Sequence, residues 1–143
     1  MNGQDFIAFA ARIAASGTND PASCRSSISR SYYGAFHLAR EFLGGLGYRC
    51  RSENEHHWVQ RHFLNCKVNE VKEIGRLLAN LHESRKEADY DLHLFHSESS
   101  QQARFCVERA ERLRIQVDSC REPTLALEIK SDMDRYRRTV SLS

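Results

Sequence analysis

The sequence predicts an all-α domain, an up-down bundle of about five helices. Only 2 prolines and 7 glycines occur among its 143 residues, and the low content of β-branched residues gives strands little support. Over several long segments, apolar residues recur three and four positions apart, which is the spacing of one face of a helix. The length suits one domain. A composition of 41% apolar and 28% charged residues is that of a soluble globular protein.

The clearest helix signal lies near the N-terminus. A first helix is expected over 5–15. The next helix begins at Pro21, a residue favoured at the first helical position, and Asp20 before it is a typical N-cap residue. This second helix runs to about Leu43 and is ended by Gly44-Gly45. Its apolar stripe comprises Ile28, Tyr32, Ala35, Phe36, Ala39, Phe42 and Leu43.

Three further helices follow. Ser52-x-x-Glu55 and Ser99-x-x-Gln102 both have the pattern of a capping box, so they predict helices that begin just after each serine. The first of them covers about 53–64, and the helix between the two covers about 69–90. We assign residues 1–120 to the bundle and 121–143 to a C-terminal tail, which either forms a short helix or stays mobile.

Charge and cysteine content restrict the function classes. A net charge of +2 does not by itself predict a polyanionic partner, although 17 Arg against 4 Lys favours phosphate or carboxylate contacts. High genomic GC content would produce the same bias. The five cysteines are widely spread without a C-x-x-C, which favours reduced thiols and a cytoplasmic location. No apolar run approaches the roughly 18 residues of a membrane span, and the N-terminus lacks the pattern of a signal peptide.

Arg85 interrupts the apolar stripe of the 69–90 helix, which otherwise consists of Val71, Ile74, Leu78 and Leu81. A charge that faces a core needs a partner, and Asp89, four residues later, can supply it. Arg85 is therefore either part of a structural ion pair or a cation placed at a cleft or subunit interface.

A polar face also runs along the second helix, beside its apolar stripe. It consists of Ser26, Arg30, Tyr33, His37 and Arg40. This face is either solvated or lines a site for a phosphate and a base, because Arg binds phosphate and Tyr stacks on bases.

Two segments resemble the signature motifs of one family. Residues 27–37, Ser-Ile-Ser-Arg-Ser-Tyr-Tyr-Gly-Ala-Phe-His, resemble the signature helix of small HEPN proteins, which typically reads S-R-x-Y-Y-A-x-F-H. Residues 81–90, Leu-His-Glu-Ser-Arg-Lys-Glu-Ala-Asp-Tyr, resemble their second signature, L-x-x-x-R-x-x-A-D-Y. The order and the separation fit, and the resemblance covers about 5–118.

The resemblance implies a HEPN-like bundle of four to five helices that forms a homodimer, with the second signature at the dimer interface. Nuclease members carry Arg-x(4–6)-His there and cleave RNA without metal, the His acting on the ribose 2′-OH and the Arg on the phosphate. Here positions 90–92 hold Tyr, Asp and Leu. The candidates for the missing base are His93 and His96, and also His82, one turn before Arg85; the first two are alternatively ordinary loop histidines.

Tyr90 admits a further use. Some HEPN toxins are neutralised when a partner nucleotidyltransferase adenylylates a tyrosine beside the motif, and Tyr90 stands close to that position. The alternative is an aromatic ring that packs over the Arg85–Asp89 pair. No metal site is predicted, because His56, His57, His62 and Cys66 lack the second pair of a tetrahedral set.

The sequence thus predicts a cytoplasmic HEPN-type homodimer that binds or cleaves RNA, or binds a nucleotide, as half of a toxin–antitoxin or defence pair with a nucleotidyltransferase partner. Arg85 would bind phosphate and His93 or His96 would act as base, in a metal-independent endoribonuclease without a cofactor. The residues expected to line the site are Arg30, Tyr33, His37, Asp89 and Tyr90. The alternative is a non-catalytic HEPN scaffold that recruits a partner protein.

Overall fold

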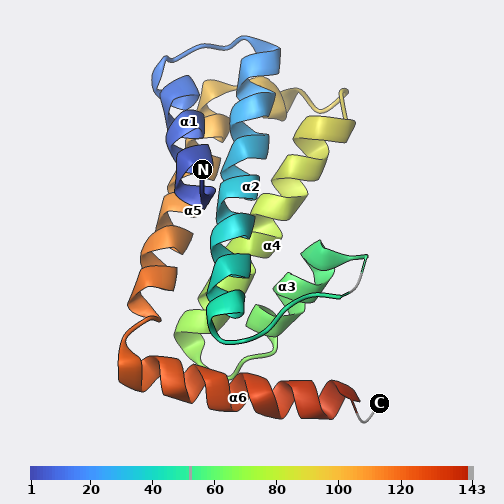
Figure 1. Cartoon of the computed structure of the whole chain (residues 1–143). Helices are drawn as coiled ribbons and strands as arrows, with labels where there is room; N and C mark the ends of the chain where they lie inside the picture. Colours follow the sequence, from blue (N-terminus) through green and yellow to red (C-terminus); the bar gives the residue numbers. More distant parts are fainter. Residues whose placement is uncertain (52, 142–143) are drawn as a thin grey trace.

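Helix α2 (Pro21–Gly45) is the centre of the computed structural model, which describes residues 1–51 and 53–141. It packs against α1 (Gly3–Ala15), α4 (Asn69–Tyr90) and α5 (Ser100–Ser119). These four helices lie side by side with alternating directions, so the predicted up-down bundle is confirmed (Figure 1). The described residues form no strand.

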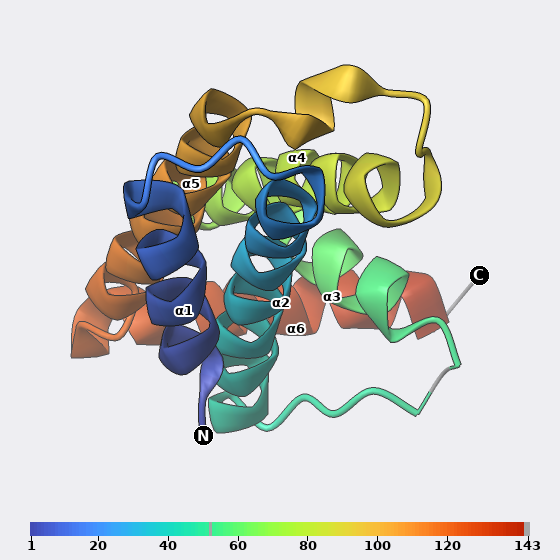
Figure 2. The same cartoon turned by 90° about the horizontal axis from the view of Figure 1, so that it is seen from above.

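Three shorter or peripheral elements complete the fold. Helix α3 (Glu55–Leu64) packs beside α4, the 3-10 helix η1 (Phe95–Glu98) follows α4, and α6 (Pro123–Ser141) crosses beneath the ends of the bundle (Figure 1). Seen from above, the described residues that follow α2 run away from the bundle (Figure 2). None of the helices in the described part of the chain combines the length and the apolar content that a membrane span requires.

Side-chain caps explain where α2, α3 and α5 begin. The Asp20 carboxylate accepts a hydrogen bond of 3.0 Å from the Ser23 amide, and Ser99 Oγ accepts one of 3.1 Å from the Gln102 amide, as predicted. Helix α3 begins two residues later than predicted, because Asn54 caps it at the His57 amide. Ser52, the cap expected from the sequence, lies outside the described residues.

The predicted apolar stripes form the core. Every residue of the α2 stripe is at most 4% exposed, and the four apolar stripe residues of α4 are fully buried. Helices α1 and α2 approach so closely that a Cβ on Gly34 would lie 2.7 Å from the carbonyl oxygen of Gly3. This contact requires a glycine at position 34.

The C-terminal tail takes the helical alternative, and α6 extends beyond the short helix expected there. Ile129 and Met133 are fully buried. Tyr48 donates a hydrogen bond to Asp134, and the Asp132 carboxylate accepts one of 2.6 Å from the Lys67 amide. Helix α6 thereby closes the lower end of the core.

Candidate functional site

Arg85 is a buried cation among three tyrosine rings. Helix α4 carries it toward α2, and the residue is only 9% exposed. Its Nη2 donates a hydrogen bond to the Tyr33 hydroxyl. The guanidinium carbon lies 5.1 Å from the ring centre of Tyr33, 5.4 Å from that of Tyr90 and 5.8 Å from that of Tyr32. These are cation–π distances.

The predicted ion pair between Arg85 and Asp89 is present. Arg85 Nε lies 3.4 Å from the Asp89 carboxylate, which also accepts a hydrogen bond of 3.2 Å from Ser29 Oγ. The Nε atom is nevertheless buried without a hydrogen bond. Burial by itself lowers the pKa of Arg85, but Tyr33, Tyr90 and Asp89 outweigh it and raise that pKa, so the guanidinium stays charged.

Two histidines lie next to this cation. The Tyr32 ring stacks on His82 with centroids 4.9 Å apart, and the His56 and His82 rings are 5.3 Å apart. Tyr32 Oη lies 2.5 Å from His56 Nδ1, and Gln60 Nε2 lies 2.5 Å from His82 Nδ1. Helices α2, α3 and α4 each contribute to this cluster.

Burial and neighbouring charge keep both imidazoles neutral. Burial, with the charge of Arg85 adding to it, lowers the pKa of His56. Burial and the nearby His56 lower the pKa of His82 to about 4. Burial also raises the pKa of Tyr32 well above its usual range, so its hydroxyl keeps its proton and forms a neutral hydrogen bond with His56 Nδ1. The cluster therefore contains one permanent cation and two neutral bases.

Two of the residues expected to line the site lie elsewhere. Arg30 is exposed, with its guanidinium 5.6 Å from the Phe6 ring centre. His37 stacks on the same Phe6 ring at 5.3 Å and accepts a hydrogen bond of 2.9 Å from Arg40. Both contact α1, whereas Tyr33, Asp89 and Tyr90 surround Arg85.

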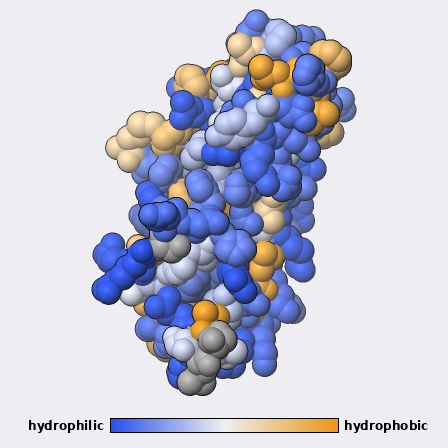
Figure 3. Space-filling model, turned by 90° about the vertical axis from the view of Figure 1, so that its right-hand side faces the viewer, coloured by the Kyte–Doolittle hydropathy of each residue, from blue (hydrophilic) through white to orange (hydrophobic). Residues whose placement is uncertain are grey.

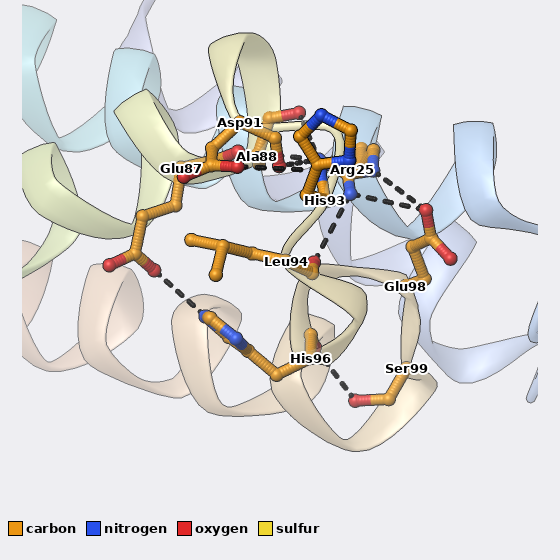
Figure 4. A network of polar contacts seen from close by, with 9 residues as sticks. All are labelled: Arg25, Glu87, Ala88, Asp91, His93, Leu94, His96, Glu98 and Ser99. Atoms are coloured by element: carbon orange, nitrogen blue, oxygen red, sulfur yellow. Dashed lines mark hydrogen bonds and ion pairs between the residues drawn. The ribbon is translucent and has the colours of Figure 1, made fainter.

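The two candidate bases of the 91–99 linker have other neighbours. His96 Nε2 lies 2.8 Å from the Glu87 carboxylate (Figure 4). His93 is exposed, and its backbone amide donates to Asp91. Within the described part of the chain, neither imidazole contacts Arg85. Their catalytic roles stay predictions, and His56 and His82 are the histidines that lie beside the cation.

Arg25, which was not predicted as a functional residue, organises this linker. Its guanidinium lies at the centre of the network in Figure 4 and forms a 3.1 Å ion pair with Glu98. It also donates to four backbone carbonyls, those of Glu87, Ala88, Asp91 and Leu94. Arg25 stands three residues before Ile28 on the apolar stripe of α2, so the criterion that identified Arg85 would have found it as well.

The weak zinc candidates do not come together. His62 is buried against Trp58, with ring centres 4.2 Å apart, and its Nε2 lies 3.1 Å from Arg137 Nη1. Across residues 1–51 and 53–141, no group of three or more His, Cys, Asp or Glu side chains is arranged to hold a metal ion.

The surface beside the cluster is mostly hydrophilic (Figure 3). Hydrophobic atoms gather at its upper end, where the linker after α4 lies in Figure 1. At the end of α4 and in this linker, Tyr90, Leu92 and Phe95 are 73%, 66% and 76% exposed. The ring that covers Arg85 thus belongs to a segment that presents large apolar side chains to solvent.

Comparison with known proteins identifies no relative. No protein-family model matches this chain, and no curated protein or solved structure is significantly similar to it. The resemblance to HEPN proteins therefore rests on residues 27–37 and 81–90 alone and stays a prediction.

Proposed function

We propose that this chain is a HEPN-type protein that binds RNA or a nucleotide, with Arg85 as its phosphate-binding group. The observation that carries this proposal is the incomplete hydrogen bonding of Arg85. Its Nε is buried without a hydrogen bond, and among the described residues its Nη1 makes none either. Although Nε lies 3.4 Å from the Asp89 carboxylate, a buried polar group without a hydrogen bond calls for a ligand or another explanation. A phosphate oxygen is the acceptor that a guanidinium binds most strongly.

Tyr90 controls the access to Arg85. Its ring lies over the guanidinium, yet the residue is 73% exposed and is the last of α4. Because most of the Tyr90 side chain faces solvent, its rotation breaks few packing contacts and exposes the Arg85 guanidinium. The rings of Tyr90 and Tyr33 are then available to stack on a base, an interaction worth about 1–3 kcal/mol per base.

The catalytic form of this proposal is a metal-independent endoribonuclease. A neutral imidazole removes the proton of a ribose 2′-OH and the oxygen attacks the adjacent phosphorus. The bond between phosphorus and the 5′-oxygen breaks, this oxygen takes a proton from water, and the imidazolium then returns its proton to the solvent. The products are a 2′,3′-cyclic phosphate and a 5′-hydroxyl, and Arg85 stabilises the charge that develops on the phosphate. We favour His56 or His82 as the base over His93 and His96, because they lie in the Arg85 cluster.

The cellular role that we propose is the HEPN half of a toxin–antitoxin or defence pair. The two signature-like segments support this role, and the exposed Leu92 and Phe95 beside Tyr90 suit a homodimer interface. Tyr90 has an exposed side chain at a helix end, where a partner nucleotidyltransferase can reach its hydroxyl.

The second candidate function is a non-catalytic scaffold. The Arg85–Asp89 ion pair and the hydrogen bond to Tyr33 favour it, because both are contacts of a structural arginine. In this case the exposed surface after α4 recruits a partner protein, and Arg85 only stabilises the bundle.

RNA cleavage and binding, measured in EDTA, separate these functions. Arg85→Lys keeps the positive charge but loses the guanidinium, and Arg76→Ala removes an exposed arginine of the same helix as the matched control. Far-ultraviolet circular dichroism verifies that both variants are folded. For a nuclease we expect cleavage in EDTA by the wild type and by Arg76→Ala, and a loss of about 100-fold or more in Arg85→Lys.

If the wild type binds RNA but does not cleave it, and this binding weakens in Arg85→Lys, the protein is an RNA- or nucleotide-binding protein. Equal behaviour of the wild type and Arg85→Lys in both assays contradicts the role of Arg85 and leaves the scaffold.

A further inference from the structure

A concave surface lies at the C-terminal half of α2, away from Arg85. This groove has a volume of about 1200 Å³. It is open to solvent and is bordered by the start of α1, by parts of the segment 37–50, by the start of α3 and by the region where α5 leads into α6. A volume of this size is sufficient for a small organic ligand.

Aromatic rings form part of its wall. Phe6 and His37 are stacked with an interplanar angle of 26° and both line the groove. Trp58 of α3 also lines it and is only partly buried. Partly exposed flat rings in a concave site are the usual means of binding a planar ring system.

Three guanidinium groups line the same groove. Arg49 is exposed and forms no ion pair with the described residues. Arg40 pairs with Glu55 at 2.7 Å, but the Arg40 side chain is 46% exposed and that of Glu55 is 33% exposed, so solvent weakens this contact. Arg121 is paired only with Asp118, outside the lining of the groove. An anionic ligand can therefore engage Arg49 directly and compete with Glu55 for Arg40.

We propose that this groove binds a nucleotide, with the base against Trp58 or the Phe6–His37 pair and the phosphates on Arg40 and Arg49. Planar rings next to guanidinium groups match the two parts of a nucleotide, since Arg binds phosphate in a bidentate manner. His37, expected from the sequence to line a nucleotide site, lies in this groove. The proposal does not depend on Arg85 or on membership of the HEPN family.

Trp58 provides a direct reporter, because it is the single tryptophan of the chain. We would titrate the full chain in EDTA with ATP, ADP and AMP, following Trp fluorescence and, independently, isothermal titration calorimetry. Adenosine lacks the phosphates and pyrophosphate lacks the base, so both should bind at least about tenfold more weakly than ATP. A single-stranded oligoadenylate tests whether the site takes RNA instead.

Four variants define the position of the ligand. Arg49→Ala should weaken ATP binding about tenfold, and Glu55→Gln should tighten it because Arg40 is released. Arg76→Ala and Arg85→Lys should leave ATP binding unchanged. The Arg85→Lys variant distinguishes this groove from the proposed phosphate site at Arg85. It should abolish phosphate binding at Arg85 and leave ATP binding in the groove unchanged.

Three outcomes would overturn the proposal. The first is the absence of saturable binding of any mononucleotide up to about 10 mM. The second is ATP binding that is lost in Arg85→Lys but kept in Arg49→Ala. The third is binding of the oligoadenylate without binding of a mononucleotide.

Discussion

Arg25 and Glu98 are 73 positions apart in the chain and form a 3.1 Å ion pair that holds the 91–99 linker against α2. The same guanidinium donates to three backbone carbonyls at the end of α4 and to that of Leu94. A cation at the C-terminal end of a helix is favourable for its dipole. The Arg25 side chain thus caps the C-terminal end of α4 and positions the linker that follows it.

Replacement of Arg25 should destabilise the fold strongly. Arg25→Met keeps much of the side-chain volume but leaves the carbonyl groups and Glu98 without their donor, and we expect a loss of about 3 kcal/mol in the free energy of unfolding. Urea denaturation measures it. Arg76→Ala, at an exposed i,i+3 pair with Glu73, should change this free energy by less than about 0.5 kcal/mol. Equal losses in both variants would contradict the role of Arg25.

The close contact between α1 and α2 can be tested with a pair of glycines. Gly34→Ala places a methyl group 2.5 Å from Ile7 Cγ1 and 2.7 Å from the Gly3 carbonyl oxygen. We expect destabilisation by about 1–3 kcal/mol, despite the better helix propensity of alanine. Gly44 lies in the same helix with no atom near its Cβ position, so Gly44→Ala should be neutral or stabilising. The midpoint temperature of thermal unfolding should therefore fall in Gly34→Ala and should stay unchanged or rise in Gly44→Ala. An unchanged midpoint in Gly34→Ala would contradict the close contact of the two helices.

The contribution of α6 to the core can be measured within that helix. Ile129 is fully buried, and Ile129→Ala should lower the free energy of unfolding by about 2–4 kcal/mol. Leu127 is 74% exposed two residues earlier, so Leu127→Ala should cost less than about 0.5 kcal/mol. If the two variants unfold at the same urea concentration, α6 does not pack on the bundle in solution.

His82 should make stability depend on pH. Its pKa is lowered from 6.5 to about 4 in the folded protein, so the unfolded chain binds more protons between these values. This contribution to stability is complete above about pH 6.5 and is lost as the pH falls toward 4. The free energy of unfolding, measured by urea denaturation at several pH values in this range, should therefore fall less steeply in His82→Asn than in the wild type.

The matched control for this effect is Gln101→Ala, which alters an exposed side chain that does not titrate. It should keep the pH dependence of the wild type. His56 and His62 also have lowered pKa values, so His82→Asn removes only part of the slope. An unchanged slope in His82→Asn would show that His82 does not remain neutral in the folded protein.

Most of the helical framework could be predicted, because its signals are local. The Asp20 cap and the following proline depend on residues within one turn, and the α2 stripe depends only on helical period. The Arg85–Asp89 ion pair was predictable for the same reason, since residues four apart lie on one face of a helix. The sequence alone therefore determined the fold class, most helix boundaries and the cation at the candidate site.

The tertiary structure decided which side chains surround that cation. Tyr33 is 52 positions from Arg85, and Gln60 is 22 positions from His82. Their contacts depend on how α2, α3 and α4 pack, and helical periodicity within one segment does not contain that information. The docking of α6 was open for the same reason, because Ile129 and Met133 become core residues only where other helices form a surface to bury them.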